Sequence, residues 1–577
     1  MKTITTRRIS QVFFLLLFLW FCVASTYGAK FWQLRAWPVN WFLQLDPLVG
    51  ISTILSTHTL YWPLLWGLAV IILTVLLGRF FCGWICPFGT IQHFISCLGL
   101  KTRTTGQMLK ANKYNNAQKI KYFILIIFLL AAAQAYPRQS LLTGLLDPIP
   151  LITRSINTAI LPIIDNFSNV ISVTDRSYTG GAVVLVIFSS VLLLCLIVPR
   201  FYCRFLCPLG ALFGLIDRFS IWRIGRTASL CTDCKLCQRH CQGGCEPAKK
   251  IYKPECILCF NCTDVCPHQA IKYQIQIPDA GEHLSPNLGR RGFLLSLLGG
   301  GLTVPAISLG QAKGCDDDIV RPPGSLPEEE FLKRCIKCSQ CMRICPSNVI
   351  SPCGIEKGIE KLWTPVMNNR IGSSGCQLNC TACSQVCPTA AIRPISLAEK
   401  QGTGQFADAG PVKIGTAVFD RNRCLPWAMD KPCIVCQENC PVSPKAIYTS
   451  EYFANVRDAR FRVKKWAPHS VKIDQPALKA DEFAGGDYYC LAEDDNEPRR
   501  ILSNTADNIV VDSEKTWKAI GANVKILIRL QRPYVDADKC IGCGICQHEC
   551  PVSGKGAIEV FADGQSRSSQ KTILRRS

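Results

Sequence analysis

The stretch Cys540-Ile-Gly-Cys543-Gly-Ile-Cys546-Gln-His-Glu-Cys550-Pro551 has the spacing that decides the fold of the C-terminal half of this chain. Three cysteines at intervals of three, followed by a Cys-Pro pair, form the ligand pattern of cubane iron–sulfur clusters. Five further runs follow this pattern or depart from it slightly, and they begin at Cys231, Cys256, Cys335, Cys376 and Cys424. Six such runs in adjacent pairs predict electron transfer through iron–sulfur clusters.

The spacing also predicts which cysteines bind together, because the last cysteine of each run serves the neighbouring cluster in two-cluster proteins of this type. Six [4Fe–4S] clusters are expected, with the ligand sets Cys231, Cys234, Cys237 and Cys266; Cys256, Cys259, Cys262 and Cys241; Cys335, Cys338, Cys341 and Cys387; Cys376, Cys380, Cys383 and Cys345; Cys424, Cys433, Cys436 and Cys550; and Cys540, Cys543, Cys546 and Cys440. Cys241 precedes Gln242 instead of a proline, and Cys245 is close, so either can be the fourth ligand there.

Composition excludes several other classes of protein. The chain has 577 residues, 35 cysteines and 7 histidines, whereas disulfide scaffolds are mostly short secreted domains. Structural zinc is the main alternative, but its sites usually pair two short Cys-x-x-Cys knuckles. No Cys-x-x-Cys-His haem attachment and no pair of mid-span histidines for a b-type haem occurs. The net charge of +22 comes without a nucleic-acid-binding motif, so no nucleic-acid partner is expected.

Four apolar stretches predict membrane spans, at residues 12–27, 60–77, 120–135 and 180–198. The first could instead be a cleaved signal peptide. Lysines and arginines concentrate between the second and third stretches and after the fourth. By the positive-inside rule, the N-terminus and residues 200–288 should then be cytoplasmic.

The membrane part contains an internal repeat. The segment Arg79-Phe-Phe-Cys82-Gly-Trp-Ile-Cys86-Pro-Phe-Gly matches Arg200-Phe-Tyr-Cys203-Arg-Phe-Leu-Cys207-Pro-Leu-Gly, and an Asp-Pro pair lies upstream of each, at Asp46 and Asp147. Cys82, Cys86, Cys203 and Cys207 are therefore expected at the cytoplasmic ends of two related helices. They could hold a further metal or redox centre, act as a thiol–disulfide pair, or only shape a turn.

A twin-arginine motif, Arg290-Arg291-Gly-Phe293-Leu-Leu, precedes a weakly apolar, glycine-rich stretch. It resembles an export signal for folded, cofactor-loaded domains, which would make the twin-arginine translocase a partner during assembly. Otherwise the arginines only flank a fifth span, or the stretch is a hydrophobic cytoplasmic linker. The predicted domains are residues 1–199 in the membrane, 200–288 with two clusters, 289–310 as the motif and fifth span, and 311–577 with four exported clusters in two pairs, 330–400 and 420–560.

The expected fold class is an α-helical membrane domain of four spans in two repeats, with a fifth span, plus α+β ferredoxin-like [4Fe–4S] domains. These residues resemble a known family pair. Residues 1–288 resemble the NapH-type membrane subunit of periplasmic nitrate reductase systems, and the part from Arg290 on resembles the NapG-type subunit, as if the two were fused. The methylamine-utilisation proteins MauN and MauM have the same layout. Residues 451–535 match no motif.

The resemblance implies a quinol dehydrogenase in the bacterial inner membrane, with residues 311–577 in the periplasm. Electrons would pass from quinol, for example menaquinol, to a periplasmic reductase or cytochrome. The chain has no nucleotide-binding fingerprint, which also favours the membrane quinone pool as its redox partner. The alternatives are a maturation or regulatory membrane ferredoxin for a periplasmic, copper or haem enzyme, and reverse flow into quinone. Asp46, His58 and Asp147 are candidate bases for quinol oxidation, although each Asp could simply cap a helix before its proline.

Overall fold

The computed structural model of the protein describes residues 3–27, 38–101, 103–134, 140–168, 176–178, 180–275, 282–283, 286, 288–309, 319–474, 478–512, 517 and 520–567. It forms two compact units. The first unit comprises Met1–Ser373 and Asn379–Val412, and the second comprises Ser374–Leu378 and Lys413–Ser577. The two units do not follow the predicted domain boundaries, because the cysteine runs that begin at Cys335 and Cys376 lie largely with the helices.

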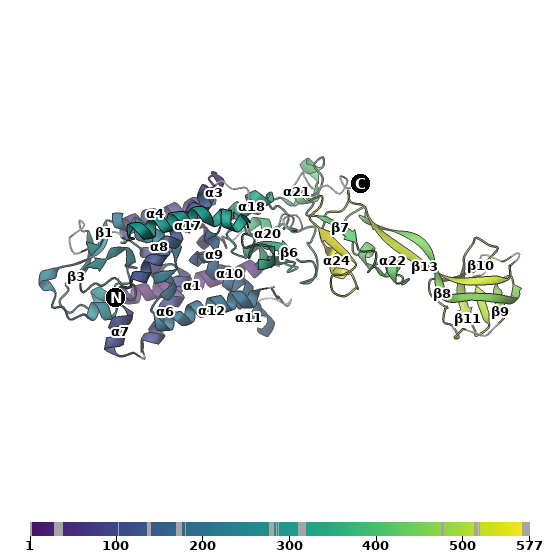
Figure 1. Ribbon diagram of the computed structural model, residues 1–577, viewed down its shortest axis with the longest axis horizontal. Helices are drawn as coiled ribbons and strands as arrows, with labels where there is room; N and C mark the ends of the chain where they lie inside the picture. The colour runs from purple at the N-terminus through teal and green to yellow at the C-terminus, as the bar shows by residue number, and fades with distance from the viewer. Residues whose placement is uncertain are drawn as a thin grey trace. The chain divides into compact units, whose positions relative to one another are not determined.

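Apolar helices occupy the four predicted spans. They are α1 (Thr3–Tyr27), α4 (Trp66–Leu77), α8 (Ile120–Ala133) and α12 (Gly181–Ile197) (Figure 1). Large apolar side chains such as Phe13, Leu68 and Val186 are exposed on them, as expected for helices that face lipid. Within the described residues, Thr3–Thr26 and Thr105–Ala133 are long and apolar enough to cross a membrane, whereas Trp62–Leu77 and Gly181–Ile197 are shorter. Four spans therefore remain a prediction.

The sequence repeat is also a repeat of structure. In the first copy, α3 (Pro47–Thr57), η2 (Trp62–Leu65) and α4 lead to α5 (Phe80–Trp84) and α6 (Pro87–Lys101). In the second copy, α10 (Pro148–Ser155), the π-helical turn η4 (Ile156–Ile160), α11 (Leu161–Ser168) and α12 lead to α13 (Phe201–Phe205) and α14 (Pro208–Ile216). Each copy therefore has an Asp-Pro helix start, an apolar helix, a short helix that carries the first cysteine of its Cys-x-x-x-Cys motif, and a proline-headed helix.

The twin-arginine segment forms α17 (Arg290–Leu309), which packs along α8 in the first unit (Figure 1). A Cβ atom at Gly292 would lie 2.8 Å from Phe123 Cζ, and one at Gly300 would lie 2.8 Å from Leu130 Cδ1. The order of these contacts means that the two helices run in the same direction. Small residues that let helix backbones approach closely are typical of helix pairs in membranes.

Short antiparallel strand pairs accompany three of the cluster regions. They are β1 (Trp222–Arg226) with β3 (Ile271–Ile275), β5 (Ile350–Pro352) with β6 (Pro365–Met367), and β7 (Thr416–Phe419) with β14 (Ile558–Phe561). Parallel β2 (Ile251–Tyr252) and β4 (Glu282–His283) form a fourth pair. The Ala-Ile pairs after the runs (Ala270-Ile271, Ala391-Ile392, Ala446-Ile447 and Ala557-Ile558) are all buried, which fits the predicted ferredoxin-like half-domains.

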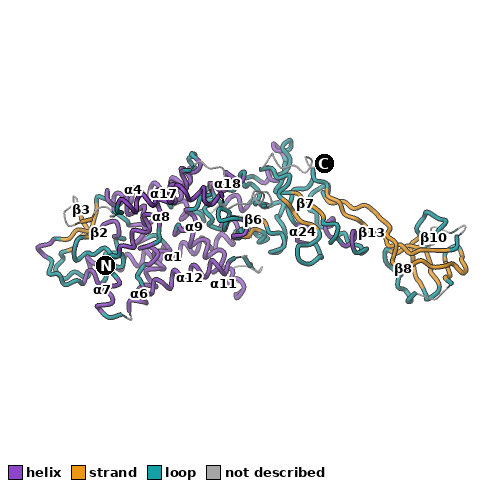
Figure 2. The backbone as a smooth tube through the Cα atoms, viewed as in Figure 1, coloured by secondary structure: helices purple, strands orange, loops and turns teal. Residues whose placement is uncertain are grey.

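Residues 447–535 form a closed six-stranded barrel that the sequence did not predict. The strand order is β10 (Tyr488–Ala492), β11 (Arg499–Asn504), β12 (Asn508–Val511), β9 (Ser470–Ile473), β8 (Ile447–Ala467) and β13 (Asn523–Val535). Its core includes Val471, Cys490, Ile509 and Ile526, each with no exposed surface. The long strands β8 and β13 also pair beyond the part where β10 joins them, from Ile447↔Val535 to Phe453↔Arg529, as the pair of orange tubes in Figure 2 shows.

Shorter helices complete the structure. In the first unit they are α2 (Trp41–Gln44), α7 (Thr105–Ala111), η3 (Asn116–Lys119), α9 (Thr143–Leu146), η5 (Asp217–Phe219), η6 (Ala228–Leu230), α15 (Leu236–Arg239), η7 (Lys253–Glu255), α16 (Asn261–Asp264), α18 (Glu328–Arg334), α19 (Gln340–Arg343), η8 (Ile355–Lys357), α20 (Ala382–Gln385), α21 (Leu397–Gln401) and η9 (Gly404–Phe406). In the second unit they are α22 (Leu425–Ala428), α23 (Val435–Glu438) and α24 (Ile545–Glu549).

The packing of α17 on α8 predicts different outcomes at two adjacent glycines. In Gly300→Val, the new side chain would meet Leu130 Cβ at 2.9 Å and Ile127 Cα at 3.2 Å, whereas a Cβ at Gly301 has no neighbour within 4 Å. Overpacking of this kind costs about 1–3 kcal/mol. We expect Gly300→Val to lower the thermal unfolding midpoint of the detergent-solubilised protein, and Gly301→Val to leave it nearly unchanged. Equal midpoints for both variants would contradict the helix pairing.

Candidate iron–sulfur sites and a buried carboxyl pair

One predicted ligand set surrounds a hollow beside the loop Cys256–Cys262, called the inner cluster loop below. Cys241, Cys256, Cys259 and Cys262 all line it. Cys245 lines the same hollow, and its amide donates to Cys241 Sγ at 3.3 Å. The structure thus brings the predicted four thiols together and adds a fifth, which leaves both Cys241 and Cys245 in reach as the fourth ligand.

A second enclosed hollow lies beside α18 and α19. Cys335, Cys338, Cys341 and Cys387 line it, and this is the ligand set that the spacing predicts. The amide of Ile392 donates to Cys387 Sγ at 3.4 Å. N–H···S bonds of this kind stabilise a thiolate and tune the reduction potential of a cluster. The residues present therefore fit a [4Fe–4S] cluster.

Two further sets converge in the second unit. Burial, together with the nearby Cys433 and Cys550 thiols, raises the pKa of Cys424 to about 11. Burial likewise raises the pKa of Cys546, with contributions from Cys543, Cys540, Cys436 and Cys440. The predicted partners are thus neighbours in both sets, and each needs a positive centre such as iron to hold its thiols as thiolates. No group of three or more His, Cys, Asp or Glu side chains in the described residues is arranged to hold a single metal ion.

The structure supports the remaining two sets less completely. Burial raises the pKa of Cys237 to about 12, and Cys241, Cys231 and Cys234 add to the shift, so three predicted ligands of the first run are neighbours. Cys266 follows α16 and is partly buried. Cys345, Cys380 and Cys383 lie in the first unit, whereas Cys376 belongs to the second, where its amide donates to Cys543 O at 2.7 Å. These two ligand sets stay predictions.

Four cysteine loops, those with two residues between the first and second cysteine, contain residues in the left-handed backbone conformation. The residues on both sides of the second cysteine have positive φ: Asp233 and Lys235, Leu258 and Phe260, Lys337 and Ser339, and Gly542 and Gly544. Residues with a side chain rarely adopt this conformation, so the strain indicates a functional constraint. The two glycines of the last loop are the sequence signal for this geometry. The two runs with a longer first gap do not have positive φ beside the second cysteine.

The four repeat cysteines gather where the two copies of the repeat interlock. Cys86 and Cys207 precede α6 and α14, and their sulfurs accept from Gly89 N at 3.4 Å and Gly210 N at 3.1 Å. Burial raises the pKa of Cys207, and the nearby Cys203, Cys82 and Cys86 raise it further. The structure thus brings all four thiols together. The amides at the two helix starts lower the pKa of Cys86 and Cys207, but burial outweighs them and raises both.

Asp46 and Asp147 meet in the core of the first unit, and neither has any exposed surface. Asp46 caps α3, because its Oδ1 accepts from Leu48 N at 3.0 Å. Asp147 makes no such cap, and its side chain instead pairs with that of Asp46. Burial raises the pKa of both carboxyls, and Asp46 raises that of Asp147 further. Two buried carboxyls side by side cannot both ionise easily, so the pair is expected to retain a proton.

The third candidate base, His58, lies away from this pair. It ends α3 in a left-handed conformation and is exposed. Asp46 starts the same helix, and its 11 residues span about 16 Å at the usual helical rise. The structure therefore brings together Asp46 and Asp147 but not His58.

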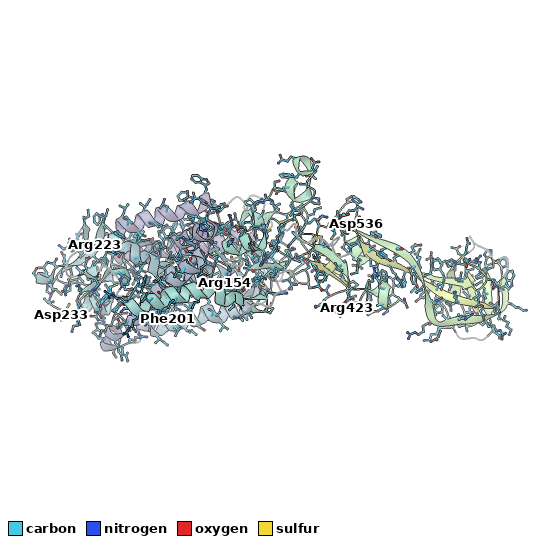
Figure 3. All side chains as sticks on the ribbon, turned by 45° about the horizontal axis from the view of Figure 1, so that its top comes forward. Arg154, Phe201, Arg223, Asp233, Arg423 and Asp536 are labelled. Carbon is cyan, nitrogen blue, oxygen red and sulfur yellow. The ribbon has the colours of Figure 1, made fainter. Side chains whose placement is uncertain are left out.

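Arg154 joins α9, which directly precedes Asp147, to the loop Cys335–Cys341, called the outer cluster loop below. It is buried among the packed helices (Figure 3), and its Nη1 donates to Gly144 O at 3.0 Å and Lys337 O at 3.2 Å. A Cβ at Gly144 would lie 2.2 Å from Ile336 O, so this close approach needs glycine. Asn157, in the π-helical turn, donates to Gln340 Oε1 at 2.9 Å. The loop that carries Cys335, Cys338 and Cys341 is thus held directly against the helices.

A buried ion pair anchors the same loop. Arg343 Nη1 lies 2.6 Å from Asp165 Oδ2, and both side chains are fully buried. Arg343 Nε also donates to Thr26 Oγ1 at 2.6 Å, and its carbonyl accepts from Arg176 Nη1 at 2.6 Å. Sequence reasoning singled out none of Arg154, Asn157, Asp165 or Arg343. Arg154, Asn157 and Asp165 interrupt an apolar stretch after Asp147 that was not predicted as a span, and polar residues in such a stretch were the available signal.

The inner cluster loop is anchored at the opposite end of the repeat. Arg7 Nη1 donates to Cys259 O at 2.6 Å, and Trp84 Nε1 donates to Leu258 O at 3.0 Å. Lys121 forms a buried ion pair with Glu255, which also accepts from Tyr122 Oη at 3.1 Å. Cluster-binding loops thus pack against the helices at both ends of the first unit.

The two cysteines at the inner hollow can be told apart by substitution. We expect Cys241→Ser to remove one cluster's worth of iron and sulfide from the purified chain, because its sulfur accepts an amide as Cys387 does. Cys245→Ser should keep the full iron content. Buried Cys490→Ser in the barrel is the matched control. Loss of iron in Cys245→Ser only would reassign the fourth ligand.

The Arg343–Asp165 pair predicts a large loss of stability in one variant. Asp165→Asn leaves the buried guanidinium without its counter-charge, and breaking a buried pair costs about 3–5 kcal/mol. We expect a lower free energy of unfolding for the first unit, measured by denaturant titration in detergent. Asp474→Asn, an exposed carboxylate of the barrel, should leave this value unchanged.

Comparisons with known proteins identify the iron–sulfur character of the chain. A family described as "4Fe-4S binding domain" matches residues 59–104 and 181–227, one match on each copy of the repeat and each including its two cysteines. A second family of that description matches residues 531–552, and a "4Fe-4S dicluster domain" matches residues 334–391. The chain is therefore an iron–sulfur protein with ferredoxin-type domains.

Relatives among curated proteins agree with this. The Methanocaldococcus jannaschii protein MJ0749 is 29% identical over 35% of this chain and 67% of its own length. "Ferredoxin-type protein NapH" of Haemophilus influenzae is 26% identical over 41% of this chain and 77% of its own. "Regulatory protein NosR" of Pseudomonas aeruginosa is 29% identical over 40% of this chain and 28% of its own. No solved structure matches. These similarities support an iron–sulfur electron-transfer protein of the NapH/NosR type.

Proposed function

We propose that this chain is a membrane quinol dehydrogenase, which oxidises quinol at the outer end of the repeat and passes electrons through the outer clusters to a periplasmic acceptor such as a reductase. The carrying observation is that Gly144 and Arg154, which lie three residues before and seven residues after Asp147, both contact the cluster loop Cys335–Cys341. A proton acceptor and an electron acceptor are thus neighbours, as quinol oxidation requires. The part from Arg290 on would act as a fused NapG-type partner.

Buried positive charge favours electron acceptance by the cluster that this loop would hold. Lys337 and Arg154 are both about 1% exposed, and both lie close to Cys335. Positive charge in a low-dielectric surrounding favours the more negative, reduced form of a cluster and so raises its potential. A raised reduction potential makes the cluster a better electron acceptor from quinol than an electron donor to quinone.

The parallel packing of α17 and α8 supports the proposed topology. Lys119 and Lys121 lie at the start of α8, and Arg290 and Arg291 lie at the start of α17. Both helices would then leave the cytoplasm in the same direction, which places residues 200–288 inside and residues 311–577 in the periplasm. The twin-arginine route would export the cluster-loaded part.

The four repeat cysteines would hold a further iron–sulfur or other redox centre in the middle of the first unit. Tyr202, which precedes Cys203, donates to the carbonyl of Leu146, the neighbour of Asp147. Gly83, which follows Cys82, approaches Ile257 of the inner cluster loop. A centre here would lie on the path between the two ends of the unit.

A regulatory role is the second candidate. Two relatives carry the name "Regulatory protein NosR", and the match to each covers about two fifths of this chain (40% and 39%). A regulatory chain would not need to turn over quinol. Addition of a menaquinol analogue to the iron-replete chain under anaerobic conditions separates the two roles: reduced cluster spectra support the dehydrogenase, and unchanged spectra support regulation.

The carboxyl pair predicts a pH profile for this reaction. A base must be unprotonated to accept a proton from quinol, and burial raises the pKa of Asp46 to about 6. The rate of cluster reduction should therefore rise with pH as the pair loses its proton. Asp147→Asn should slow the reaction by about 100-fold, the lower range for loss of a general base, and should remove this rise.

The control is Asp474→Asn, whose carboxylate is exposed in the barrel. It should keep both the rate and the pH profile in stopped-flow records of the cluster spectrum. A native rate and profile in Asp147→Asn, at full iron content, would exclude the pair as the base.

A further inference from the structure

A cavity of about 690 Å³ opens at the inner end of the first unit, and nothing above assigns it a role. It is built where the start of α1, the end of α4, helix α5, the inner cluster loop and strand β3 meet. Its volume lies within the usual range for small-molecule sites. The Asp46–Asp147 pair lies elsewhere, at the start of α3 and α10.

Four aromatic rings give this cavity flat apolar walls. Phe80 and Trp84 stack with their centroids 4.8 Å apart, and Phe260 stands edge-on to Trp84 at 5.9 Å. Tyr273 stands edge-on to Phe260 at 5.1 Å. Trp84 Nε1 donates to Leu258 O at 3.0 Å, and Tyr273 Oη donates to Leu77 O at 2.9 Å. Hydrogen bonds to the backbone thus hold two of the rings in place, so the site is preformed for a planar ring.

Polar groups stand at the rim of the same cavity. Lys272, Gln269 and Thr263 can donate hydrogen bonds, and Asp264 can accept them. Asp264 Oδ2 also accepts from Ile4 N at 3.4 Å, which fixes its position at the start of α1. An aromatic interior with a few donors at the edge matches a ring that carries carbonyl oxygens.

The cavity lies where apolar helices end. Leu77 is the last residue of α4, and the strand pair β1–β3 is tied to this end because Ile221 N donates to Val75 O at 3.0 Å. Leu76, Trp222 and Ile275 present exposed apolar surface beside it. A ligand with a long apolar tail could therefore keep its tail along the helices while its ring enters the cavity.

One loop separates this cavity from a cluster site. Phe260 lies between Cys259 and Cys262, and both cysteines line the inner hollow. A ring in the cavity would be separated from that cluster by this loop only. A planar ring with carbonyl oxygens, an apolar tail and a redox neighbour describes a quinone.

We propose that this cavity is a second quinone site, on the inner face, in contact with the loop Cys256–Cys262. The choice of quinone as ligand rests on the proposed function, but the site itself does not. It gives the inner cluster pair a redox partner of its own, separate from the carboxyl pair at the outer end.

Photolabelling with a short-tailed azidonaphthoquinone tests the site in the iron-replete full chain. We expect label on peptides that contain residues 80–84 or 260–273, and competition by unmodified menadione. Phe80→Ala removes the stacked wall and should weaken menadione competition about tenfold, and Lys272→Gln should weaken it by a smaller factor. Phe219→Ala, an aromatic residue that is 66% exposed and does not line the cavity, should have no effect. Iron content verifies the fold of each variant.

Three results would overturn the inference: label elsewhere on the chain, native competition in both cavity variants, or displacement by oleate as effective as that by menadione, which would indicate a lipid acyl site. The outcome is distinct from the fate of the proposed function. Label in the cavity without cluster reduction by quinol would refute the dehydrogenase and keep the site. Cluster reduction by quinol without label in the cavity would keep the dehydrogenase and refute the second site.

Discussion

Arg343 is the charge on which the arrangement of the first unit depends. It lies in α19, inside the outer cluster loop, and it is fully buried. Asp165 of α11, Thr26 of α1 and Arg176 each bind one of its polar groups, so three separated parts of the chain converge on one residue. A buried ion pair adds little net stability, because desolvation offsets its attraction, but it penalises every other placement of the charges. The pair therefore fixes where the outer cluster loop lies relative to the helices.

The repeat explains why the buried aspartates and the Cys-x-x-x-Cys motifs come in twos. Each copy supplies one buried aspartate and two cysteines, and packing of the copies brings equivalent residues together. The two copies differ at the carboxyl pair and in the helix that follows it. One oxygen of Asp46 caps its helix, whereas Asp147 makes no cap hydrogen bond, so the two carboxyls differ although their sequence contexts are alike. The π-helical turn after α10 is a second departure, and it carries Asn157 to the outer cluster loop.

Sequence spacing predicted the local chemistry well because cluster ligands lie on short loops. Cys335, Cys338, Cys341 and Cys387 line one hollow as expected, and the apolar stretches became helices at nearly the predicted residues. Docking between distant segments could not be predicted in this way. Nothing local to Arg343 or Asp165 reveals that they pair across 178 positions. The barrel was missed because its strands alternate only briefly and contain no turn motif, and the assignment of Cys376 to the second unit depends on packing against Cys543.

The paired strands β8 and β13, called the β8–β13 arm here, connect the barrel to the cluster region of the second unit. The chain leaves the cluster region at Ile447 and returns at Val535, and these two residues face each other in one ladder. The barrel therefore lies within one long hairpin connection. The pairing of β8 with β13 already holds the two ends of this connection together beside the cluster region. The entropy of closing a loop grows only slowly with its length, so the barrel could be enlarged, exchanged or lost at small cost to the fold around the cysteines. The arm makes the barrel a separately evolvable module in a chain whose other parts are fixed by their metal ligands.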